Sequence, residues 1–253
     1  MSFIWAILQR EIKSYLVSPL TYTAIAVFIV FQGVAFFFAL GEYERMRVAA
    51  AQNPMMTVPG TESLVRGFLG HDVIWTMLLI VPLVTMRLLS EERRQRTAEL
   101  LLTAPLTTRQ LVIGKYVGAL GLLVVMLALT AWMPLVLDSW GDVDYAPIFT
   151  GYLGAFLYGA LLIAIGLLAS SLTESVMIAA FLTLLMVGVI NVLGVLATEI
   201  PIIGYSLEKF TPSGNLQLLA QGVIDTLPLV FFASTIVFVI ELTGRIVDSQ
   251  RWR

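Results

Sequence analysis

The sequence has no cysteine and a single histidine, His71, in 253 residues. The absence of cysteine excludes disulfides, thiolate metal sites and cysteine nucleophiles. One histidine cannot supply a cluster of histidine ligands or the two histidines of an H-E-x-x-H hydrolase. A serine–histidine hydrolase would need His71 to serve a residue such as Ser213, whose neighbours Pro212 and Gly214 do not form a nucleophile motif. We therefore expect no catalytic, metal or cofactor site in this chain.

Charged residues are also scarce. They make up 13% of the chain, against roughly 25% in a typical soluble domain, while 58% of the residues are hydrophobic. The apolar residues fall into blocks of the length that crosses the hydrocarbon core of a bilayer. These features predict an all-α integral membrane protein, a single domain over 1–253, with six transmembrane helices at about 20–40, 73–90, 116–137, 147–170, 175–197 and 226–245.

Two of these spans contain charged residues near their ends. The second span is short and contains Pro82, but Arg87 can extend its side chain from the helix end to the membrane interface. The last span contains Glu241 and Arg245, whose i,i+4 spacing predicts an ion pair on one face of the helix. A structural pair is favoured over an ion relay because both residues lie near the end of the span.

Basic residues in the loops predict the orientation, because Lys and Arg favour the cytoplasmic side. With the N-terminus inside, eleven of the fifteen basic residues are cytoplasmic, and the four outside are Arg45, Arg47, Arg66 and Lys209. The sequence thus predicts that both termini lie in the cytoplasm.

Two segments outside the spans have unusual patterns. Residues 2–18 place apolar side chains on one side of a helix and Gln9, Arg10 and Lys13 on the other, which predicts a helix lying in the inner interface. Residues 198–225 are too apolar for an ordinary outer loop and include prolines and glycines. Because irregular backbone at membrane depth must be buried in protein or line a cavity, we expect a re-entrant segment here.

The segment 91–109 carries the strongest functional signal. It begins with alternating acidic and basic residues, continues into the apolar run 100–102, breaks at Pro105 and restarts with a capping box at 107–110. A loop that needed only to be soluble would not require this pattern. We expect a short cytoplasmic helix that docks on a separate motor protein, with the contact made by Glu91, Glu92, Arg93, Arg94, Arg96 and Glu99.

Gly114 and Lys115 superficially resemble part of a nucleotide-binding loop. That loop requires glycine and a hydroxyl residue where this chain has Arg109 and Tyr116. Gly114 and Gly118 instead form a small-xxx-small pair, which favours close packing of helices.

Several motifs together resemble the permeases of ABC-2 type transporters. They are SEER at 90–93, TAELLLTAPL at 97–106 and GKY at 114–116, with REIKSY at 10–15, SP at 18–19 and QGVID at 221–225. The chain looks most similar to the gliding-motility-type permeases of this family. The resemblance covers the start, middle and end of the chain and agrees with the six-helix plan, but it specifies no substrate.

The resemblance implies a half-transporter of the bacterial inner membrane that exports its substrate. Its partners would be a second permease, either a copy or a paralogue, and two copies of an ABC ATPase subunit that binds the ATP and Mg²⁺. By analogy, 2–18 is the interfacial connecting helix and 91–104 is the coupling helix. The outer gate or re-entrant segment would include Pro201, Pro212, Gly222 and Asp225.

Two other functions stay open. The chain could transmit force within an envelope assembly without moving a solute, and the outer loop 41–72 could then hold a periplasmic or membrane accessory protein. An ATP-independent secondary transporter is disfavoured because no series of Asp, Glu or His crosses the spans. We expect the lipid bilayer as the surroundings and no nucleic-acid partner.

Overall fold

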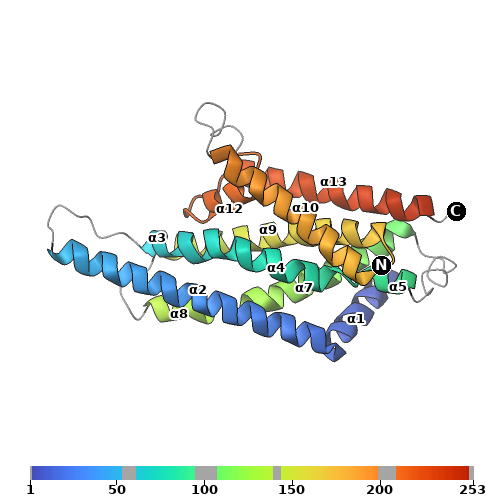
Figure 1. Cartoon of the computed structure of the whole chain (residues 1–253), viewed down its shortest axis with the longest axis horizontal. Helices are drawn as coiled ribbons and strands as arrows, with labels where there is room; N and C mark the ends of the chain where they lie inside the picture. Colours follow the sequence, from blue (N-terminus) through green and yellow to red (C-terminus); the bar gives the residue numbers. More distant parts are fainter. Residues whose placement is uncertain (1, 53–60, 95–106, 139–143, 199–208, 251–253) are drawn as a thin grey trace.

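A computed structural model describes residues 2–52, 61–94, 107–138, 144–198 and 209–250. These residues form helices and contain no strand. Six of the helical segments are long and apolar enough to cross a membrane. The prediction of an all-α membrane protein with six spans is therefore confirmed (Figure 1).

The helices follow one another along the chain. They are α1 (Ser2–Val17), α2 (Pro19–Gln52), α3 (Thr61–Val65), the π-helix η1 (Arg66–Asp72), α4 (Val73–Thr85), α5 (Ser90–Arg94), α7 (Thr108–Leu129), α8 (Trp132–Asp138), α9 (Tyr145–Leu172), α10 (Val176–Thr198), α12 (Pro212–Leu219) and α13 (Thr226–Gln250).

The centre of the bundle is α9. Of its most apolar stretch, 83% of the residues are buried, whereas the corresponding share is 22% for α2, α10 and α13. Helices α4, α7, α10, α12 and α13 all pack against α9. The outer faces of α2, α10 and α13 are left for lipid or for other subunits, because exposed apolar side chains there are compatible with a bilayer.

Polar side chains inside the bundle are paired across helices. The Tyr158 hydroxyl donates to the Asn191 side-chain oxygen at 2.9 Å, joining α9 to α10. The Tyr116 hydroxyl donates to the Ala160 carbonyl at 3.2 Å, joining α7 to α9. Such bonds satisfy groups that would otherwise be costly to bury.

The second span begins earlier than the charge-free stretch 73–90 suggests. Helices α3, η1 and α4 are continuous, and the membrane-length segment runs Ser63–Thr85. The charged residues Arg66 and Asp72 do not end the helix. Val65, Phe68 and Leu69, which precede His71, are fully buried. The core therefore extends into what the sequence suggests is an outer loop.

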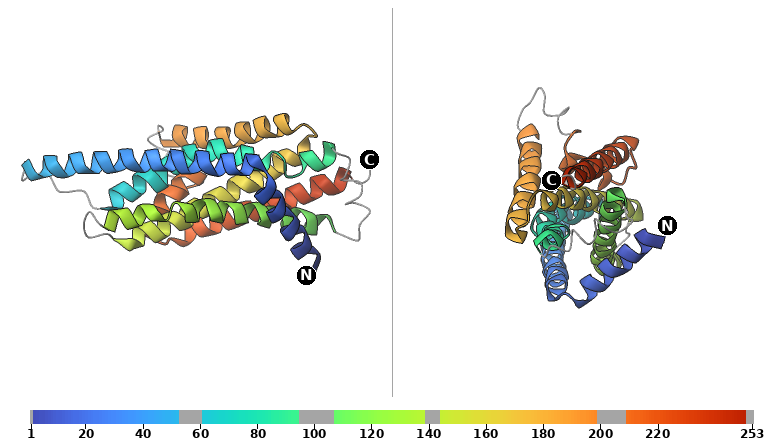
Figure 2. Two further views of the ribbon diagram at one scale, coloured as in Figure 1. Left: turned by 90° about the horizontal axis from the view of Figure 1, so that it is seen from below. Right: turned by 90° about the vertical axis from the view of Figure 1, so that its right-hand side faces the viewer.

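Helix α2 is much longer than one membrane crossing. Its 34 residues correspond to about 51 Å at the rise of an α-helix, against about 30 Å of hydrocarbon. Beyond Gly41 it has ion pairs between Arg45 and Glu42 at 2.8 Å and between Arg47 and Glu44 at 3.8 Å. This charged extension projects past the rest of the bundle (Figures 1 and 2).

Both chain termini lie at the same end of the bundle, together with α5 and the start of α7 (Figure 1). We refer to this as the termini-bearing end. Helices α3, α8 and α12 lie toward the opposite end. An even number of crossings requires this arrangement of the termini.

Candidate functional site at the termini-bearing end

The first turn of α7 begins directly after the segment 91–106 and has a complete capping box. The Thr107 hydroxyl accepts from the Gln110 backbone N–H at 3.3 Å, and the Gln110 side chain accepts from the Thr107 N–H at 3.2 Å. The capping box that the sequence predicts is thus confirmed. It fixes where α7 starts, because two backbone donors that have no partner within the helix are satisfied.

Helix α1 packs closely on the next turns of α7. A Cβ atom at Gly114 would lie 2.8 Å from an Ile7 side-chain carbon, and one at Gly118 would lie 2.9 Å from Glu11 Cβ. Both distances are shorter than real carbon–carbon contacts, so the two glycines allow the observed spacing of the helices. The glycine pair therefore lies against the N-terminal helix.

A buried ion pair lies between these glycines. Lys115 Nζ is 3.0 Å from Glu11 Oε1, and the two side chains are only 3% and 13% exposed. Removing one partner of such a buried pair strongly destabilises a protein, because the other charge is then left buried without compensation. The pair fixes the position of α1 along α7.

The same end of α7 is also joined to α13. Arg109 is 3.1 Å from Glu241, and the Thr108 hydroxyl is 3.0 Å from Asp248 Oδ1. The prediction that Glu241 pairs with Arg245 is wrong, since Glu241 reaches across to α7. The i,i+4 spacing permits the intrahelical pair, but only the packing of α7 beside α13 brings Arg109 within reach.

The residues expected to dock on a motor are partly described. Glu91 and Arg94 lie in α5, as do the backbones of Glu92 and Arg93. Arg87 Nε is 3.9 Å from Glu91 Oε2, and both side chains are partly exposed. Arg96 and Glu99 lie outside the described residues. The structure therefore places the beginning of the docking segment at the termini-bearing end, next to α4.

At the opposite end, part of the expected re-entrant segment forms α12. Pro212 begins this helix, the Thr211 hydroxyl accepts from the Gly214 N–H at 3.2 Å, and the helix packs against α9, η1, α10 and α13. Pro201 lies outside the described residues.

A tight turn then leads into α13. Gly222 has φ of +90°, and a Cβ atom there would lie 3.0 Å from Pro147. Asp225 accepts from the Leu227 N–H at 3.4 Å at the start of α13. Glycine suits this turn because other residues rarely adopt positive φ.

Sequence reasoning did not identify Glu11, Asp248 or the pairing of Arg109 as parts of this site. Glu11 is an ordinary charge on an amphipathic helix until α1 is placed against α7. One signal was available in the sequence. Gly114 and Gly118 predict a close helix contact, and Lys115 between them would be buried there and would need an anionic partner.

The fold and the site together define a multi-pass membrane protein with paired charges at one end of its bundle. A family model described as ABC-2 family transporter protein matches residues 52–240. Since the match covers most of the chain, the chain belongs to the ABC-2 transporter family. It is a permease subunit of an ABC transporter, and its family implies an ABC ATPase as partner.

No curated protein was found to match the chain. The family match confirms the resemblance that the motifs at 90–106 and 114–116 suggested. The greater similarity to gliding-motility-type permeases stays a prediction.

Proposed function

We propose that this permease is half of an ATP-driven exporter of the bacterial inner membrane, with its termini-bearing end in the cytoplasm. A separate ATPase subunit would bind and hydrolyse ATP with Mg²⁺, and this chain would have neither cofactor nor catalytic residues. A second permease, identical or paralogous, would complete the pathway. The observation that carries the proposal is the set of contacts joining α7 to α1 and α13 immediately after the docking segment.

Those contacts favour movement of three helices together. If the docking segment moved, α7 would receive the movement at Thr107, where the capping box fixes the start of the helix. Within its first three turns α7 is joined to α1 by the Lys115–Glu11 pair and to α13 by the Arg109–Glu241 pair. Helices α1, α7 and α13 are therefore suited to act as one body driven from the ATPase.

The ATPase can favour one permease state only if it binds the two states with different free energies. A coupling free energy of about 1–3 kcal/mol, typical of allosteric systems, would change the population ratio by about 5- to 150-fold. Contacts made by Glu91, Glu92, Arg93, Arg94, Arg96 and Glu99 are expected to supply this difference.

The decisive experiment reverses charges in the docking segment. We expect Glu92→Lys combined with Arg94→Glu to reduce co-purification of the ATPase subunit and to abolish stimulation of its activity by the permease. Reversal of Glu42 and Arg45, an exposed pair on the α2 extension, is the matched control and should leave both unchanged. Unchanged association and stimulation in the docking variant would overturn the proposed role of the segment.

The orientation is testable because the chain has no native cysteine. In intact cells, a membrane-impermeant maleimide should label Arg45→Cys on the α2 extension but not Ser249→Cys near the end of α13. Both positions are exposed, so accessibility within the fold does not limit labelling. Labelling of Ser249→Cys before permeabilisation would reverse the assignment of the sides.

The charged extension of α2 favours a second candidate function, namely force transmission to an envelope partner. This extension, 42–52, projects beyond the bundle and is suited to hold such a partner (Figure 2). A reconstituted complex that hydrolyses ATP but moves none of a broad panel of lipids, peptides and drugs would favour this function. ATP-dependent movement of any of these compounds would support export.

A further inference from the structure

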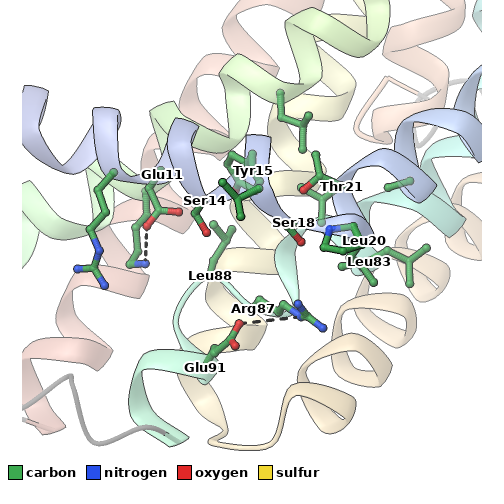
Figure 3. Close-up of a pocket in the computed structure, with 17 residues that line it drawn as sticks. Glu11, Ser14, Tyr15, Ser18, Leu20, Thr21, Leu83, Arg87, Leu88 and Glu91 are labelled. Carbon is green, nitrogen blue, oxygen red and sulfur yellow. Dashed lines mark hydrogen bonds and ion pairs between the residues drawn. The ribbon is translucent and has the colours of Figure 1, made fainter.

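A cavity of about 470 Å³ lies at the termini-bearing end, and Glu91, one of the residues expected to dock on the ATPase, is among the residues that line it. Its walls come from α1, the start of α2, the last turn of α4 with the following turn, α5 and α7. Figure 3 shows Ser14, Tyr15 and Ser18 on one side of it and Arg87 with Glu91 on another. The volume is within the range of about 300–1,000 Å³ typical of small-molecule sites.

Among the described residues that line this cavity, cations outnumber anions. Its lining includes the three cations Arg10, Arg87 and Lys115 and the two anions Glu11 and Glu91. Lys115 and Glu11 neutralise one another in a wall of the cavity at 3.0 Å. Arg87 and Glu91 are held only loosely at 3.9 Å, so the guanidinium retains donors for another acceptor.

Hydroxyl groups in the lining also favour an anion. Ser18 and Thr21, at the start of α2, line the cavity, and a hydroxyl group can donate to an anion. Tyr15 lines the cavity, and its hydroxyl oxygen is buried without a hydrogen-bond partner. Burial, and to a lesser extent the charge of Glu11, raises the pKa of Tyr15, so this hydroxyl stays protonated and able to donate.

Apolar side chains beside the charges indicate what carries the anion. Val17 lines the cavity yet is 81% exposed, and the neighbouring Leu16 is 62% exposed. Leu20, Leu83 and Val84 complete an apolar part of the lining. A water-soluble anion would gain nothing from these side chains, whereas a lipid would cover them with its acyl chains.

We propose that this cavity binds one anionic glycerophospholipid from the leaflet at the termini-bearing end, with its phosphodiester beside Arg87 and the start of α2. The lipid would fill the space between the interfacial helix α1 and the spans. This inference concerns the chain itself and does not depend on the ATPase or on the direction of transport.

The test is native mass spectrometry of the full chain in detergent micelles, titrated with dioleoylphosphatidylglycerol. Two competitors separate the parts of the ligand: glycerophosphoglycerol has the phosphodiester without acyl chains, and dioleoylglycerol has the chains without phosphate. We expect one tightly bound phosphatidylglycerol and binding of either competitor at least tenfold weaker. If glycerophosphoglycerol bound as tightly as phosphatidylglycerol, the cavity would be a site for soluble anions. If dioleoylglycerol bound as tightly, the acyl chains would bind to the apolar surface without a contribution from the phosphate. Either result overturns the proposal.

Variants then locate the site. Arg87→Gln should weaken phosphatidylglycerol binding by about tenfold or more, because a charge-assisted hydrogen bond is lost. Arg245→Gln removes the same charge at the same end but outside this cavity, and should change binding less than about twofold. Ser14→Trp, at an exposed position of the lining, should fill the cavity and weaken binding while all charges remain. Equal effects of the two arginine variants, or unchanged binding in Ser14→Trp, would refute the site; thermal unfolding of each variant verifies that it is folded.

Discussion

The buried pair of Lys115 and Glu11 gives the most direct test of how α1 is attached to α7. Replacing Lys115 with Met removes the cation and leaves a carboxylate whose side chain is only 13% exposed. Loss of one partner of a buried pair typically costs about 3–5 kcal/mol. We expect Lys115→Met and Glu11→Gln each to destabilise the protein by an amount toward the lower end of that range, because the pair lies close to the surface of the bundle.

The double variant distinguishes an ion pair from two independent charges. With both side chains neutral no uncompensated charge is left, so Glu11→Gln with Lys115→Met should be much less destabilised than the sum of the single variants. The interaction energy in this cycle should reach about 1 kcal/mol or more, since contacting residues couple by about 0.5–3 kcal/mol.

The assay is reversible unfolding in mixed detergent and SDS micelles, followed by the fluorescence of the five tryptophans. Glu42→Gln, which breaks an exposed pair of the same type on α2, should shift the transition little and serves as the control. Additive effects of Glu11 and Lys115, or single-variant losses no larger than the control, would refute the view that this pair holds α1 in place.

Three further predictions follow from contacts of the same bundle. Gly118→Leu should cost about 1–3 kcal/mol in the same unfolding assay, because the added side chain collides with α1, whereas Gly121→Leu, with open space around its Cβ position, should be tolerated; similar losses in both would contradict the packing role. Reversing either charge of the exposed Arg109–Glu241 pair should change stability by only about 0.2–1 kcal/mol, yet lower the ATPase stimulation measured on the complex, and the doubly reversed variant should recover it. Failure of the double reversal to recover stimulation would argue against a link between α7 and α13. Tyr158→Phe should cost about 0.6–1.7 kcal/mol of unfolding free energy by leaving the Asn191 oxygen without its donor, and no measurable loss would mean that the bond adds nothing to the bundle.

The sequence alone was sufficient for the class of fold and for the family. Apolar runs of membrane length determine the number of spans, because a bilayer accepts only segments that satisfy their own backbone hydrogen bonds. The capping box at 107–110 was also predictable, since it depends only on residues three positions apart. Family motifs at 90–106 are likewise local in the sequence.

Tertiary structure decided which charges pair and where the cavity lies. Glu241 has an allowed partner in Arg245 on its own helix, yet it pairs with Arg109, 132 positions away along the chain. Lys115 meets Glu11 only because two glycines let α1 approach α7. Sequence periodicity specifies the face of a helix on which a residue lies, but not the helix that packs against that face. Pairing between distant helices and the space left between them therefore depend on how the whole bundle packs.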